Sequence, residues 1–227
     1  MRRVGTTGNA GGDEGSATNR HARTIEIVSA VVLSLAAVAT AWCSYQSTRW
    51  HGVQANSYAS ASAKRLEASR ASTEAGQLRQ IDITLFTQWL DAFALERGEL
   101  ATFYRERFRD EFQPAFQAWV ATRPRVNPDA PKSPFAMPEY KLAADARAAR
   151  LDEEAEAFSA QARQANQRAD NYVLGVVLFA LSLFFVGVST GRFFSSHRVR
   201  LALLGVAVVV FVGAAVWIGT FPVNFSV

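Results

Sequence analysis

Few of the residue types that perform enzymatic chemistry occur in this chain of 227 residues. Its three histidines, His21, His51 and His197, lie far apart in the sequence, and Cys43 is the one cysteine. A zinc or iron site needs three or four converging ligands, and helical proteins often supply part of such a set through a Glu-x-x-His pairing, which this sequence lacks. We therefore expect no metal, no cofactor and no histidine-activated nucleophile, and the single cysteine excludes an intramolecular disulfide.

Carboxylates come closer to a catalytic arrangement, because two of them could serve glycoside hydrolysis. Glu106 and Asp110 are four residues apart, and the run Asp152–Glu156 contains four acids. Arginines neighbour the first pair, as on a solvated helix face. Asp82 differs because aliphatic residues surround it, so we expect it to be partly buried in an ion pair with Arg79 or with an arginine further along the chain. We expect no enzymatic activity.

Three stretches without any charge, residues 27–48, 171–191 and 201–227, indicate a membrane protein. Each is about as long as the ~20 residues that a helix needs to cross the hydrocarbon core of a bilayer. We predict an all-α chain anchored in the lipid bilayer by three such helices. The predicted transmembrane helices are 25–47, 171–191 and 201–220.

The net charge lies beside these helices. Of 24 basic and 20 acidic residues, 17 and 17 lie in residues 49–170, which leaves 7 − 3 = +4 for the remainder. The neutral middle segment argues against nucleic acid as a partner, and arginines beside a span favour the cytoplasmic side. Arginines precede the first span and also lie between the second and third, so both places are cytoplasmic only if residues 48–170 lie outside.

This charge pattern predicts a multi-pass protein of the cytoplasmic (inner) membrane with an extracytoplasmic domain at 48–170. The other predicted segments are a disordered cytoplasmic tail at 1–24, a cytoplasmic turn at 192–200 and an extracytoplasmic tail at 221–227. Ala39-Thr40-Ala41 has the small-x-small form of a signal-peptide cleavage site. Because helix-forming sequence continues past it, we expect an uncleaved anchor.

The extracytoplasmic domain is predicted to be a helical hairpin with two arms, residues 48–76 and 139–170. In the second arm, apolar residues recur at spacings of four and three from Ala144 to Tyr172, the heptad pattern of coiled coils. Two isolated alanine-lined helices bury little apolar area, so we expect the arms to pair with a second copy, most simply as a homodimer. A side-by-side four-helix bundle is the alternative. The expected oligomer seam is Ala148, Leu151, Ala155, Phe158, Ala162 and Ala165.

Nine aromatic residues lie in the 34 residues from Phe86 to Trp119. Several of them are spaced by four, which predicts one helix at about 98–122 with a kink at Pro114. We expect residues 77–121 to form an aromatic head, and residues 122–138, which hold five of the seven prolines, to form an extended connection. The candidate ligand-binding or partner-binding residues are Phe86, Trp89, Phe93, Arg105, Phe108, Arg109, Phe112 and Trp119.

Four runs of sequence also carry a resemblance. They are ATAWCSYQSTRW at 39–50, QLRQIDITLFTQWL at 77–90, NPDAPKSPFAMPEY at 127–140 and QANQRADNY at 164–172. In these runs the chain resembles a family of uncharacterised bacterial inner-membrane proteins with the same three-span layout. The resemblance implies a bacterial cytoplasmic membrane and brings no activity, ligand or catalytic residue with it.

Two non-enzymatic functions are consistent with these expectations. The first is a structural or interaction protein of the bacterial cell envelope that contacts itself or another envelope protein. The second is a binding module whose aromatic head holds a small molecule or lipid. A closed head of interlocking rings favours the first, whereas an open pocket of a few hundred Å³ lined by aromatics and an arginine favours the second.

Overall fold

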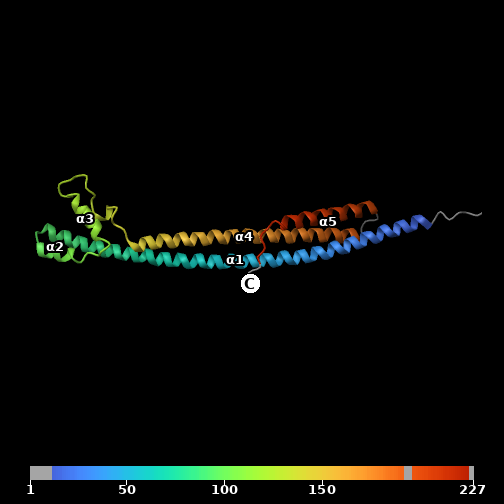
Figure 1. The fold of residues 1–227 in the computed structure, drawn as a ribbon, viewed down its shortest axis with the longest axis horizontal. Coiled ribbons are helices and arrows are strands. Elements are labelled where there is room, and N and C mark those ends of the chain that lie inside the picture. Colours follow the sequence, from blue (N-terminus) through green and yellow to red (C-terminus); the bar gives the residue numbers. More distant parts are fainter. Residues whose placement is uncertain (1–11, 192–195, 225–227) are drawn as a thin grey trace, which may run out of the picture. The chain divides into compact units, whose positions relative to one another are not determined.

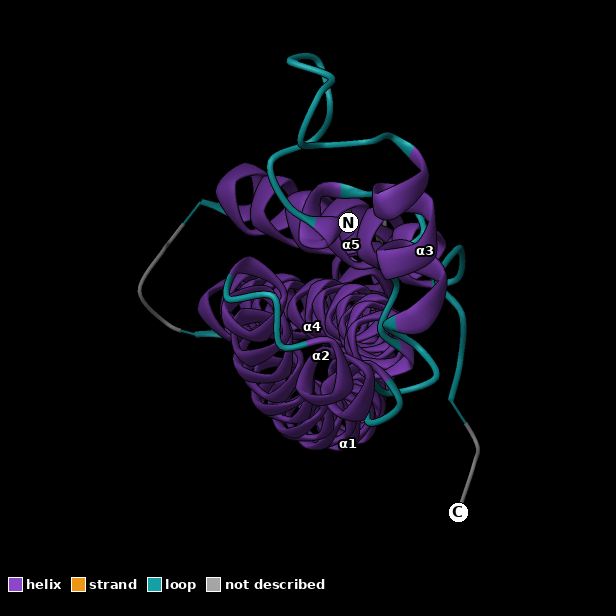
Figure 2. Cartoon of the chain, turned by 90° about the vertical axis from the view of Figure 1, so that its left-hand side faces the viewer, coloured by secondary structure: helices purple, strands orange, loops and turns teal. Residues whose placement is uncertain are grey.

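The computed structural model describes residues 12–191 and 196–224, and all regular secondary structure in these ranges is helical (Figures 1 and 2). The prediction of an all-α chain is therefore confirmed for the described residues. In chain order the elements are α1 (Gly12–Ala94), α2 (Gly98–Arg105), α3 (Gln113–Ala121), the 3-10 turn η1 (Pro134–Ala136), α4 (Ala143–Thr190) and α5 (His197–Ile218).

The chain divides into two compact units, to which α1 and α4 both contribute. We call Met1–Ala55 together with Ala162–Val227 the span unit, and Asn56–Gln161 the hairpin unit. Among the described residues, three helices contain apolar stretches long enough to cross a membrane, and these belong to α1, α4 and α5. This arrangement is compatible with a multi-pass membrane protein.

Close helix packing and a hydrogen bond between two helices hold the span unit together. Gly175 of α4 lies against α5 and α1, where a Cβ atom would stand 2.6 Å from Ile218 Cδ1 and 3.2 Å from Cys43 Sγ. The buried Ser182 hydroxyl donates a hydrogen bond of 2.9 Å to the backbone oxygen of Ala207 in α5. Hydrocarbon offers no water to replace such a bond, so internal satisfaction is required of a spanning structure.

The chain after α5 is fixed against the other two helices of the span unit. Gln46, which is fully buried, accepts a hydrogen bond of 3.0 Å from the Asn224 backbone N–H, and its own amide donates one of 3.4 Å to the Asn224 backbone oxygen. The Tyr172 hydroxyl donates to the backbone oxygen of Pro222 at 3.2 Å. Residues 221–224 of the predicted tail are therefore held in place, and 225–227 lie outside the described residues.

In the hairpin unit, α1 and α4 run antiparallel (Figure 1). Ala68 and Ala71 of α1 pack on Ala148 and Leu151 of α4. Ion pairs flank this seam, including Lys64 with Glu154 at 2.8 Å and Arg147 with Glu74. Their side chains are partly exposed, so each pair contributes little, and small buried side chains rather than charges set how closely the helices approach.

Several predicted boundaries are wrong. The helix that contains the first span begins at Gly12, whereas a disordered tail was predicted up to residue 24. Once a helix has formed, each further residue adds one backbone hydrogen bond, which favours its extension. Residues 1–11 lie outside the described residues. Helix α1 passes residue 76, the predicted boundary between arm and head, without a break and continues to Ala94. The return helix begins at Ala143 rather than 139. Of the predicted turn at 192–200, residues 192–195 lie outside the described residues, and α5 already begins at His197.

The single helix expected at 98–122 is also wrong. Two helices occupy this segment, α2 and α3, and a turn at 106–112 separates them. Pro114 lies in the first turn of α3, where its missing N–H costs no helical hydrogen bond. The proline therefore marks the start of a helix and not a kink within one.

Candidate binding groove at the tip of the hairpin unit

Residues 82–142, which we call the tip, pack around a cluster of aromatic side chains. Phe112 is fully buried, and Phe116 makes edge-to-face contacts with both Trp89 and Phe108 at centroid distances of 4.8 Å. Phe86 of α1 lies edge-to-face on Trp119 of α3 at 5.4 Å. Such geometry adds to the energy of apolar burial, so the cluster explains why the short helices α2 and α3 are stable beside α1.

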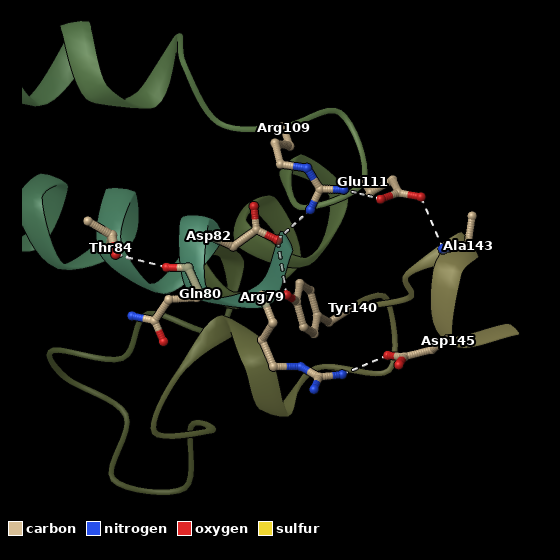
Figure 3. A network of polar contacts seen from close by, with 9 residues as sticks. All are labelled: Arg79, Gln80, Asp82, Thr84, Arg109, Glu111, Tyr140, Ala143 and Asp145. Carbon is tan, nitrogen blue, oxygen red and sulfur yellow. Dashed lines mark hydrogen bonds and ion pairs between the residues drawn. The ribbon is translucent and has the colours of Figure 1, made fainter. Parts of the chain in front are cut away.

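A polar network links the tip to the start of α4 (Figure 3). Asp82 of α1 is fully buried, and its Oδ2 accepts hydrogen bonds from Arg109 Nη1 at 2.8 Å and from the Tyr140 hydroxyl at 3.0 Å. Arg109 also pairs with Glu111, whose Oε1 accepts from the backbone N–H of Ala143 at 3.1 Å. The network thus links α1, the turn at 106–112 and the start of α4.

The sequence-based prediction for Asp82, an ion pair with an arginine further along the chain, is confirmed. The other arginine considered, Arg79, pairs instead with Asp145 of α4 at 2.6 Å (Figure 3). Burial raises the pKa of Asp82, and the hydrogen bond from Tyr140 and the charge of Arg109 act in the opposite direction. Burial together with the adjacent carboxylate raises the pKa of Tyr140, so its hydroxyl keeps the proton that it donates.

Beside the closed aromatic cluster, the tip has an open groove of about 520 Å³ between the end of α1 and the segment that follows α3. This volume lies within the usual range of small-molecule sites. Its lining combines aromatic and aliphatic side chains with three charged residues. The lining includes Trp89, Leu90, Phe93, Trp119, Val120 and Val126, with the charged Glu96, Arg123 and Arg125.

The two arginines of the groove are exposed and have no polar partner. Within the described part of the chain, neither the Arg123 nor the Arg125 guanidinium forms an ion pair or a side-chain hydrogen bond. The Arg125 guanidinium carbon lies 5.7 Å from the centroid of the Phe93 ring, within the range of a cation–π contact. The positive charges therefore stand beside an apolar surface and are available to an anion.

The groove also contains two left-handed backbone positions that are not glycine. Glu96 has φ 56° and Arg123 has φ 52°. Both follow helix ends: the Arg97 N–H bonds to the Ala92 oxygen at 2.9 Å past the end of α1, and the Arg123 N–H bonds to the Val120 oxygen at 3.0 Å past α3. Glycine is the usual residue at such positions because it has no Cβ to crowd the backbone.

The structure divides the eight predicted binding residues among different environments. Trp89, Phe93 and Trp119 line the groove. Arg105 and Phe108 line a separate, more polar hollow of about 540 Å³. The remaining three are structural, with Phe86 and Phe112 in the aromatic cluster and Arg109 bound to Asp82.

Arg123 and Arg125 are not among the residues predicted from the sequence to bind a ligand or partner. The signal was present as the run Arg123-Pro124-Arg125 directly after a helix. Because the prolines predict an extended connection at 122–138, the sequence gives no expected position for these two charges. The indole N–H of Trp119 donates to the backbone oxygen of Pro131 at 2.7 Å, which ties this connection to α3.

The six residues of the predicted oligomer seam are mostly covered by their own chain. Ala148, Leu151, Ala155, Ala162 and Ala165 are buried, and Phe158 is half-buried. The first two pack on α1 of the same chain. The heptad pattern therefore marks an intrachain contact, and a homo-oligomer, which stays a prediction, would need another surface.

No group of three histidine, cysteine or carboxylate side chains within the described ranges could hold a metal ion. A comparison of the chain with protein-family models, curated proteins and solved structures found no match. The class of protein is thus defined by its own geometry, as an all-helical chain with three candidate membrane spans and a helical tip that carries a groove.

Proposed function

We propose that this chain is a membrane-anchored binding module of the bacterial cell envelope. In this proposal the span unit anchors the protein in the inner membrane, the hairpin unit lies on the extracytoplasmic side, and the groove of the tip binds a ligand. The orientation rests on the arginines beside the spans, and the bacterial origin rests on the resemblance of the sequence runs described above.

One observation carries the proposal: two arginines without polar partners border an open, largely apolar groove. The closed aromatic cluster alone would suit a purely structural or interaction protein. A groove of this size beside it exposes apolar surface, since Phe93 is 44% and Val126 78% exposed. Exposed apolar surface bordered by charge is typical of a binding site.

Photo-crosslinking in native membranes tests this function. A photoreactive amino acid at Val126, on the edge of the groove, is compared with the same residue at Leu66, which is also exposed but lies on α1 24 residues before Leu90. That separation is about 36 Å along a helix. We expect a defined adduct at 126 that is absent at 66, and equal or absent labelling at both positions would refute the proposal.

The orientation is tested separately. With Cys43 replaced by serine, a cysteine introduced at Val126 is expected to react with a membrane-impermeant maleimide in intact spheroplasts. Reaction only after the membrane is permeabilised would place the tip in the cytoplasm and overturn the assigned topology.

A further inference from the structure

We propose that the ligand of the groove is a monocarboxylate on an apolar body, with the carboxylate bound by Arg123 and Arg125. This inference rests on the proposed binding function and specifies its chemistry. It is drawn from the polarity of the lining, its charge balance and the backbone conformation of Arg123.

The lining offers an apolar surface with few polar groups. Trp89 and Phe93 stack at a centroid distance of 5.2 Å with an interplanar angle of 15°, and Val120 lies beside them in the groove. The one polar group of Trp119 already donates to Pro131, so its indole presents only apolar surface to a ligand. A ligand body that matches this lining is aromatic or aliphatic.

The charges of the groove fit a single negative charge. Two arginines and one glutamate give 2 − 1 = +1. A guanidinium presents parallel N–H donors that match the two oxygens of a carboxylate. Glu96 would repel a dianion such as a phosphate monoester, which carries almost two charges at neutral pH. A bound monocarboxylate would leave the groove neutral, whereas a dianion would leave one negative charge uncompensated beside an apolar surface, so the charge balance favours the carboxylate.

The backbone at Arg123 supports the same assignment. A left-handed residue is strained unless it is glycine, and such strain is often found at functional sites. Arg123 occupies this conformation directly after α3 and contributes its exposed side chain to the groove. Replacing it with glycine removes the strain and the guanidinium together, which allows a loss of binding to be separated from a loss of folding.

The test uses the full chain in lipid nanodiscs, with 4-phenylbutyrate as the probe and 4-phenylbutanol as its neutral counterpart. Ligand-observed NMR or calorimetry measures affinity, with empty nanodiscs subtracted. We expect the carboxylate to bind about tenfold or more tightly than the alcohol, since a charged hydrogen bond contributes about as much as a tenfold change in affinity.

Variants then locate the carboxylate. Arg123→Gln and Arg123→Gly should each weaken 4-phenylbutyrate binding about tenfold, although the glycine variant is expected to be the more stable of the two. Glu96→Gly relieves the same kind of backbone strain and removes the opposing charge, so it should bind more tightly. Arg70→Gln is the matched control: it removes an exposed arginine of the hairpin unit outside the groove, and its binding should match that of the unaltered chain.

The results that would overturn the inference are distinct from those that would overturn the proposed function. Equal affinity for the acid and the alcohol, or unchanged binding in Arg123→Gly, would refute the carboxylate assignment and leave a ligand-binding groove. Tighter binding of phenylbutyl phosphate than of the carboxylate would refute the single-charge argument. Absence of binding by every probe would refute the monocarboxylate, and the crosslinking comparison at residues 126 and 66 would then decide the function by itself.

Discussion

Arg109→Met is expected to destabilise the tip strongly, because it leaves the buried carboxylate of Asp82 without its cation. Asp82 is 0% exposed and keeps only the hydroxyl of Tyr140 as a partner, while its Oδ1 has none. Removing one partner of a buried ion pair typically costs 3–5 kcal/mol. The surviving Tyr140 hydrogen bond reduces this cost, so we expect about 3 kcal/mol of lost stability at neutral pH.

Two matched variants isolate the buried charge. Asp82→Asn removes the charge but leaves Arg109 paired with Glu111 and 22% exposed, so it should cost only about 1 kcal/mol, comparable to one hydrogen bond. The double variant Asp82→Asn/Arg109→Met contains no buried carboxylate. It should therefore be more stable than Arg109→Met alone, by about 1–2 kcal/mol on the same estimate.

The destabilisation caused by Arg109→Met should depend on pH and become smaller as the pH falls. Burial raises the pKa of Asp82 above its ordinary value of 3.8. Between 3.8 and the raised pKa the folded state holds a proton that the unfolded state has lost, so stability falls as pH rises through this window, by at most about 1.4 kcal/mol per pH unit. Arg109→Met removes a group that lowers this pKa, which widens the window. Its destabilisation should shrink on acidification, and the double variant should not show this slope.

Hydrogen exchange with mass spectrometry, on the full chain in nanodiscs across a urea series, measures the local unfolding free energy of the turn at 106–112. The reasoning about a buried charge is refuted if Arg109→Met costs less than about 1 kcal/mol. It is equally refuted if acidification makes that variant less stable relative to the unaltered chain.

Three further predictions concern single positions. Glu96→Gly should raise the unfolding free energy of the tip by up to about 1 kcal/mol, because glycine adopts the left-handed backbone conformation without steric strain. The greater backbone entropy that glycine loses on folding offsets part of this gain, and an unchanged or lower urea midpoint would contradict the prediction. Gly175→Ala should lower the thermal stability of the span unit, since its new Cβ would lie only 2.6 Å from Ile218 Cδ1. Gly187→Ala is the control, because a Cβ there has open space around it and should leave the thermal stability unchanged. Gln46→Leu should speed amide exchange at Asn224, whose N–H it releases, and exchange as slow as in the unaltered chain would show that another group holds this segment.

The features predictable from sequence were those set by composition or by a single unusual residue. Three uncharged stretches specify apolar helices of spanning length, and no tertiary contact is needed to recognise them. Asp82 was identifiable because a lone acid among aliphatic residues must either be exposed or find a cation. Its partner, Arg109, lies 27 residues away, and only the fold brings the two together.

The remaining features depend on contacts between distant residues. The aromatic spacing around Phe108 and Phe112 continues through a turn as regularly as through a helix, so the pattern predicted one helix where the network around Asp82 stabilises a turn. The seam of α4 was predicted to face both the first arm of its own chain and a second copy, and spacing alone could not show that its own chain already covers most of it. Arg123 and Arg125 come to lie beside Phe93 because Phe135 packs on Phe86 at 5.7 Å and the same connection bonds to Trp119.

Trp89 belongs both to the closed aromatic cluster and to the groove. Its ring stacks on Phe86 at 5.8 Å in the cluster and on Phe93 at 5.2 Å in the groove. Phe86 is 8% exposed and Phe93 44% exposed, so the two rings can be removed with different consequences. Phe86→Ala should cost about 3–5 kcal/mol, as a buried phenylalanine does. Phe93→Ala should cost about 1 kcal/mol or less, because its ring is already partly in water. If the groove binds a ligand, Phe93→Ala loses binding while the urea midpoint of the tip barely moves. If Phe93→Ala instead unfolds the tip as severely as Phe86→Ala, its ring is part of the core, and the groove is a shallow surface of a structural cluster rather than a site.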